Sequence, residues 1–285
     1  MTLASRPPAS PRAASALLRF RSIVLRSFGS FESLAGNAEA RHFLPLYAAV
    51  LGVSVVLTIL YLAFALSATV PLVFDLDAEG TVPVWWSSLQ LLATGAVFGL
   101  LVLRNRRKPS VSVPLTGLAA LLVLMSLDET ASLHETIGAY VDRIVVERGN
   151  TVFSITGVWF AVLGVPLIVL LTLLFARLSV FFASVPGTLR GFAVGFIVFL
   201  GGALGVEAIS NFVAGEGMLR VWTTAWEEGF EMIGVGILLC AALRFALLHP
   251  SSGDVLRAVL RDAASEPSEP FGPFRSGRHS PHRSR

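Results

Sequence analysis

Acidic side chains gather in three short stretches of an otherwise apolar chain. The stretches are SLDETASLHE at 126–135, GVEAISN at 205–211 and EEGFEM at 227–232. Carboxylates with one histidine make a hard, oxygen-rich ligand set, which suits Mn, Fe, Mg or Ca, or Zn with mixed ligands. The same groups can carry protons in general acid–base catalysis. We therefore take these stretches as the candidate site.

Helical spacing places several of these side chains on common faces. Residues four apart stack on one another, which pairs Glu227 with Glu231 and Glu207 with Asn211. At about 100° per residue, Glu228 falls within the same arc as the first pair. Two of the three stretches can therefore present a polar face to a shared centre.

The first stretch is less regular. Asp128 and Glu135 are seven residues apart and share a face, whereas Glu129 and His134 flank that face on opposite sides. Glu129 and His134 can both point at one centre only if the helix unwinds near Thr130 or is enclosed by its neighbours. The spacing alone does not place all four groups on a single ion.

These residue types predict the following roles. The expected ligands of a divalent metal ion are one acid from each stretch: Asp128, Glu207 and Glu231. Three further groups would complete the metal shell or act as general acid or base: Glu129, His134 and Glu227. Three more could support the site from behind the ligands: Glu135, Asn211 and Glu228. Mn, Fe, Mg, Ca and Zn all stay open as the metal.

The chain that carries these residues is too apolar for a soluble protein. Of its 285 residues 54% are hydrophobic and only 14% are charged, against about 25% charged in an average soluble domain. A soluble enzyme, a disordered protein and a nucleic-acid binder are therefore excluded as the main interpretation, and membrane lipids are the expected partners. The oligomeric state stays open.

Six apolar stretches are long enough to cross a membrane, which takes about 20 helical residues. They cover 46–68, 84–103, 112–133, 153–176, 190–210 and 225–247. Backbone polar groups in lipid must be satisfied within the segment, so each stretch is expected to be a helix. The fold class predicted is all-α, a polytopic integral membrane bundle of six helices. In the fifth stretch Gly191 with Gly195, and Gly201 with Gly205, predict close packing against a neighbour.

The basic residues predict the orientation. With the N-terminus in the cytoplasm, 19 of the 22 Lys and Arg residues lie on the cytoplasmic side. The positive-inside rule therefore predicts that both termini are cytoplasmic. The membrane that we expect is the cell inner membrane. The five tryptophans fall near the outer ends of their spans and predict an aromatic belt there: Trp85, Trp86, Trp159, Trp222 and Trp226.

The termini flank a single membrane domain at 46–247. Residues 1–45 form a basic cytoplasmic segment, in which 12–30 is either an interfacial amphipathic helix or a loosely ordered basic arm. Residues 248–285 form a basic tail that is expected to be largely disordered.

The acidic residues show the opposite bias, since 13 of the 19 fall on the outer side. The helical rise puts Asp128, Glu207 and Glu231 about 20 to 25 Å above the inner ends of their helices. That is roughly 5–10 Å below the outer surface of a core about 30 Å thick. An ionisable group costs about 2.5–3.5 kcal/mol in mid-span and less near an interface. A bound cation would offset this imbalance, while a shallow solvated vestibule is the alternative.

Three functions are compatible with this layer. The first is a metal-dependent membrane enzyme that acts on a lipid or lipid-linked substrate near the outer leaflet, by hydrolysis or by oxidation. The second is a cation or proton transporter that uses the same carboxylates. The third is a non-catalytic accessory membrane protein with a polar vestibule. The inner halves of the spans hold no ionisable relay, which disfavours the transporter.

Overall fold

The computed structural model describes residues 38–67, 69–145, 160–213 and 217–249. Residues 1–37 of the predicted basic segment, with its possible helix at 12–30, and residues 250–285 of the predicted tail lie outside these ranges, whereas residues 38–45 already belong to the first helix.

The described residues form helices and no strands, and six helices are long and apolar enough to cross a membrane, which confirms the predicted all-helical fold class. The principal helices are α3 Ala38–Leu66, α4 Val82–Asn105, α5 Pro109–Ala131, α6 Leu133–Val145, α7 Val165–Phe182, α8 Thr188–Leu200, α9 Glu207–Val213 and α10 Met218–Leu248. A short 3-10 turn, η1, covers Leu72–Phe74. Two π-helical turns complete the set: η2 at Phe160–Gly164 and η3 at Gly201–Val206. Together α8, η3 and the start of α9 form one span, Thr188–Ser210.

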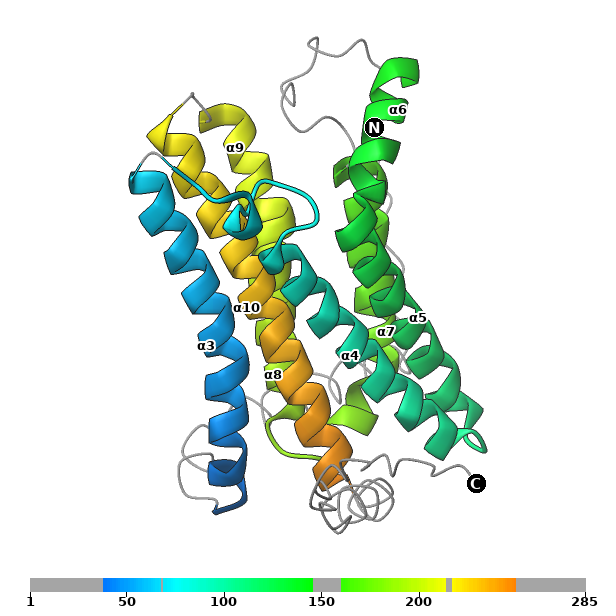
Figure 1. The fold of residues 1–285 in the computed structure, drawn as a ribbon. Helices are drawn as coiled ribbons and strands as arrows, with labels where there is room; N and C mark the ends of the chain where they lie inside the picture. Colours follow the sequence, from blue (N-terminus) through cyan, green and yellow to red (C-terminus); the bar gives the residue numbers. More distant parts are fainter. Residues whose placement is uncertain (1–37, 68, 146–159, 214–216, 250–285) are drawn as a thin grey trace, which may run out of the picture.

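Helix α10 is the central element of the bundle. It packs along α3, α4 and α8, while α4 packs on α5 and α5 packs on α7 (Figure 1). Successive spans run in opposite directions, so α3 begins and α10 ends at the same end of the bundle. The opposite end, where α4 and α10 begin, is called the acidic end below.

Tryptophans mark the acidic end. Trp85 and Trp86 lie in the first turn of α4, and Trp222 and Trp226 lie in the first turns of α10. The Trp85 side chain is 65% exposed and that of Trp226 is 53% exposed, as expected for rings at a membrane interface. Trp159 lies outside the described residues.

Phenylalanines fill the half of the bundle away from the acidic end. Phe98, Phe182, Phe192 and Phe245 come from four different helices and are fully buried. The rings of Phe182 and Phe192 lie 4.6 Å apart, and those of Phe182 and Phe245 meet edge to face at 5.2 Å. Tilted and edge-to-face ring pairs stabilise the core in addition to the stabilisation that comes from burying the rings. This half is therefore a dry, packed core.

Glycines allow α8 and α10 to approach closely. A Cβ atom on Gly191 would lie 3.0 Å from the nearest α10 side chain, and one on Gly195 would lie 3.0 Å from the carbonyl oxygen of Gly234. The predicted close packing of this first glycine pair is confirmed. For the second pair the prediction is wrong, because no neighbouring atom would come closer than 4.0 Å to a Cβ atom on Gly201 or Gly205. The π-helical turn η3 rotates these two glycines away from α10 and brings Gly202 to the contact instead.

Candidate functional site

A cavity of about 240 Å³ lies at the acidic end of the bundle. Seven ionisable residues of the three acidic stretches line it: Asp128, Glu129, His134, Glu207, Glu227, Glu228 and Glu231. The side chains of the other two candidates, Glu135 and Asn211, lie outside those that the structure describes. Apolar side chains contribute much of the remaining lining, among them Leu91, Met125, Leu167, Phe199, Leu200 and Leu204. The cavity thus brings acidic and apolar side chains to one space.

The loop between α3 and α4 contributes acids that the sequence pattern did not single out. Asp77 and Glu79 line the cavity together with Leu76. These acids are few and lie in a loop, where helical periodicity gives no direction for a side chain. Only their shared position in the acid-rich outer layer pointed to them. The described cavity therefore holds eight carboxylates and one imidazole.

Facing walls of the cavity interact through their charges. The Glu231 carboxylate on α10 interacts electrostatically with Glu129 on α5 and Glu207 on α9, as well as with its helix neighbours Glu227 and Glu228. The fifth and sixth spans also pack directly on each other, through η3 and α10. The third span joins them across the cavity. The three acidic stretches thus share one site.

Helix α5 breaks at Ser132. The helix ends at Ala131, and Ser132 adopts a left-handed conformation with φ 43° and ψ 44°. It is the one non-glycine residue with positive φ in the described part of the chain. The unwinding that Glu129 and His134 needed in order to face one centre therefore occurs two residues beyond Thr130.

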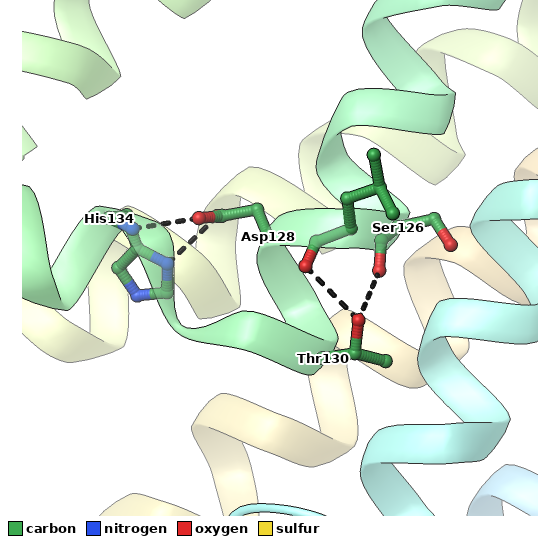
Figure 2. Close-up of polar contacts among 5 residues, drawn as sticks. Ser126, Asp128, Thr130 and His134 are labelled. Carbon is green, nitrogen blue, oxygen red and sulfur yellow. Dashed lines mark hydrogen bonds and ion pairs between the residues drawn. The ribbon is translucent and has the colours of Figure 1, made fainter.

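The break folds His134 back onto Asp128. The His134 backbone N–H donates to Asp128 Oδ1 at 2.7 Å, and His134 Nδ1 lies 2.8 Å from Asp128 Oδ2 (Figure 2). About a third of each side chain is exposed, 29% for His134 and 33% for Asp128. Both carboxylate oxygens of Asp128 thus contact His134, one at its backbone N–H and one at its ring. The second ring nitrogen of His134 points away from Asp128 (Figure 2).

Side-chain hydroxyl groups donate hydrogen bonds to backbone carbonyls near the end of α5. The Thr130 hydroxyl donates to the carbonyl oxygens of Leu127 and Ser126 at 3.1 and 3.3 Å (Figure 2). Such bonds from a threonine hydroxyl to the carbonyl three or four residues earlier are made within one helical turn. One turn earlier, the Ser88 and Ser126 hydroxyls each donate to the other residue's carbonyl at 2.9 Å. These bonds fix α5 against α4 directly below Asp128.

A substitution series tests the break at Ser132. A left-handed conformation costs an L-residue with a side chain roughly 1–2 kcal/mol, and glycine avoids that cost. We expect Ser132→Gly to keep or raise the thermal unfolding temperature in detergent and Ser132→Val to lower it. Ser110→Val, at an exposed helical serine of α5, is the control. Equal unfolding temperatures for Ser132→Val and Ser110→Val would contradict the assigned backbone conformation.

The lack of a side chain at Gly202 allows η3 to pack closely against α10 beside Glu227 and Glu231. A Cβ atom on Gly202 would lie 2.6 Å from the Glu227 carbonyl oxygen and 3.1 Å from Glu231 Cγ. Any side chain here would push the acidic residues of α10 away from Glu207. π-Helical turns inside helices are frequent at functional sites, and η3 ends directly before Glu207.

The cavity holds no ready-made metal shell. Among the residues that the structure describes, no three His, Cys, Asp or Glu side chains converge closely enough to hold a metal ion. The expected ligands Asp128, Glu207 and Glu231 surround one cavity without meeting. An ion would have to draw carboxylates together from facing walls.

Residues 44–246 match the family model described as Domain of unknown function (DUF8692). The chain belongs to this family. The match includes nearly the whole of the six spans and every cavity residue named above, so the cavity lies within the DUF8692 domain. No curated protein and no solved structure matches the chain.

Proposed function

We propose that this DUF8692 protein is a multi-pass protein of the cell membrane with both termini in the cytoplasm. Six apolar helices are compatible with a multi-pass membrane protein. Among the residues that the structure describes, most Lys and Arg residues lie toward the end opposite the cavity, including the cluster from Arg104 to Lys108 between α4 and α5. The acidic end then faces outward.

Within this membrane we propose a metal-dependent enzyme that hydrolyses a lipid or lipid-linked substrate. The observation that carries this proposal is the Asp128–His134 pair at the edge of a carboxylate-lined cavity. A carboxylate on one ring nitrogen fixes the tautomer and orientation of an imidazole, which prepares the other nitrogen for proton transfer. Proton transfer by histidine suits hydrolysis and gives no electron path, so the pair favours hydrolysis over oxidation.

In this proposal Asp128 orients the His134 ring. Because both its oxygens already hold His134, the geometry supports an orienting role for Asp128 more than a role as metal ligand. Glu207 and Glu231 would hold the divalent ion from facing walls, with Glu227 or Glu129 completing the set. When bound, the ion would offset the charge of the carboxylates and activate water, and His134 would accept the proton that the water loses.

The lining of the cavity supports an amphiphilic substrate. Leu167, Leu200 and Leu204 face the same space as the carboxylates. A lipid could place its polar bond among the acids while its chain follows the apolar wall. This arrangement supports a substrate drawn from the outer leaflet.

Metal binding is the direct test of this proposal. We expect purified protein in nanodiscs to bind Mn²⁺, measured by electron paramagnetic resonance, and the Glu207→Gln/Glu231→Gln double variant to bind at least about tenfold more weakly. Asp75→Asn, at an acid outside this cavity, is the matched control and should bind as the wild type does.

Two results would overturn the proposal. One is equal Mn²⁺ binding by wild type and double variant, or no binding by either. The other is Mn²⁺ flux into proteoliposomes that the double variant abolishes, which would make the same carboxylates the site of a transporter.

A further inference from the structure

Helix α6 follows directly on a membrane span but is too short to cross a membrane itself. It has 13 residues, whereas a span needs about 20. Its main contact is with the end of α5, and it continues outward from that end, away from α3, α9 and α10 (Figure 1). The described helices therefore leave much of its surface uncovered.

An exposed apolar stripe runs along α6. Its three members are spaced by four and by three residues, which puts them on one face of the helix: Leu133, Ile137 and Tyr140. These residues are 46%, 44% and 65% exposed. On an adjoining face Gly138 is buried and Val141 is half-buried. The helix thus turns one face towards the protein and leaves the apolar stripe pointing away from it.

The composition of α6 is that of a helix at a membrane surface. It is more amphipathic and less apolar than the principal helices of the six spans. Strong amphipathicity with low overall hydrophobicity is typical of helices that place one apolar side among lipids without crossing the bilayer. Aromatic rings with a polar tip, such as Tyr140, are enriched at the same level.

Hydrogen bonds between α4 and α5 set the level at which α6 begins. Ser126 of α5 pairs with Ser88 of α4, and the two helices run in opposite directions. Ala131, five residues beyond Ser126, is therefore level with the first turn of α4, which carries the exposed Trp85. From there the stripe of α6 extends about 10 Å outward. This length is comparable with the headgroup layer, about 5–8 Å on each side of the bilayer core.

We propose that α6 binds the lipid headgroup layer of the outer leaflet through the stripe of Leu133, Ile137 and Tyr140. His134 belongs to the first turn of the same helix, so this contact holds its ring at the level of the headgroups. The inference rests on the proposed function in that a lipid at this level is what His134 would act on.

Fluorescence quenching by spin-labelled lipids measures this contact without metal or turnover. The fluorophore nitrobenzoxadiazole is attached to Ile137→Cys or Tyr140→Cys in a Cys240→Ala background, which lacks the single native cysteine. The protein is placed in phosphatidylcholine nanodiscs that carry a nitroxide either at the headgroup or deep in the acyl chain. Leu124→Cys, at a residue of α5 that is 59% exposed, lies about two turns below the end of α5 and gives the reference inside the bilayer.

We expect headgroup-labelled lipid to quench both α6 probes more strongly than chain-labelled lipid, and the opposite order at Leu124→Cys. A probe at Leu133→Cys should lose most of its quenching by headgroup-labelled lipid in the Ile137→Ser/Tyr140→Ser variant, because the polar replacements no longer favour the lipid. Thr136→Ser, at an exposed residue beside the stripe, is the matched control and should leave that quenching unchanged.

Absence of lipid quenching at both α6 probes would overturn the proposal, and so would unchanged quenching in Ile137→Ser/Tyr140→Ser. Quenching by aqueous iodide instead of lipid would place the stripe in water. Disulfide-linked dimers of unlabelled Ile137→Cys, formed on oxidation, would make a second copy of the chain its partner. Failure of this test would leave the Mn²⁺ result standing, and loss of Mn²⁺ binding would leave the quenching result standing.

Discussion

Asp128→Asn is expected to lower lipid hydrolysis by about 10²- to 10⁴-fold, the range over which a positioned proton-transfer group contributes. Asparagine has the size of aspartate and keeps an oxygen for the His134 backbone N–H. It loses the charge that would stabilise a protonated imidazole on the other oxygen. The measurement is the release of product lipids, followed by mass spectrometry, from nanodiscs that contain a membrane lipid extract and Mn²⁺.

Asp75→Asn is again the matched control, since it removes one outer carboxylate without touching His134. It should retain the wild-type rate. A loss of the same size in both variants would mean that overall charge, and not the Asp128–His134 pair, governs turnover. An unchanged rate in Asp128→Asn would remove the pair from the mechanism.

Gly234→Ala is expected to destabilise the protein by about 1–3 kcal/mol, the usual cost of forcing extra volume into a packed contact. Its Cβ atom would overlap the Phe199 backbone nitrogen and lie 2.6 Å from the Phe199 Cα atom. Backbone atoms cannot rotate away, so α8 and α10 must separate. Phe199 lines the carboxylate cavity, and Glu231 lies one turn before Gly234.

The matched control for this substitution is Gly99→Ala in α4, where no atom lies within 4 Å of the added Cβ. Alanine is favoured over glycine inside a helix by roughly 0.5–1 kcal/mol, so this variant should be slightly more stable. The check is thermal unfolding of both variants in the same detergent. Gly234→Ala with the stability of Gly99→Ala would contradict the close contact between α8 and α10.

Much of the helical framework could be predicted from hydropathy and spacing. Apolar runs of about 20 residues have one stable form in lipid, which is why all six predicted spans correspond to helices. The glycine pair Gly191 and Gly195 was also predicted correctly as a contact. The pair Gly201 and Gly205 was not, because the π-helical turn η3 changes the angular register within the same span.

The candidate site, too, could be predicted only in part. Helical spacing placed Glu227 and Glu231 on one face, and both line the cavity. Spacing alone could not join His134 to Asp128, because six residues of regular helix would point them apart. It also gave no direction for Asp77 and Glu79, whose loop has no repeating geometry.

The six apolar helices and the layer of carboxylates near one end of the bundle follow from the order of the residues, because helical rise and burial in lipid depend on nothing else. Which acids share a space, and which of them contacts His134, depends on how the helices pack. Those outcomes depend on a left-handed residue at Ser132, a π-helical turn before Glu207 and the contact of Gly202 with α10. Such local departures from the regular helix are stabilised by neighbouring segments far away in the chain, and no periodic pattern encodes them.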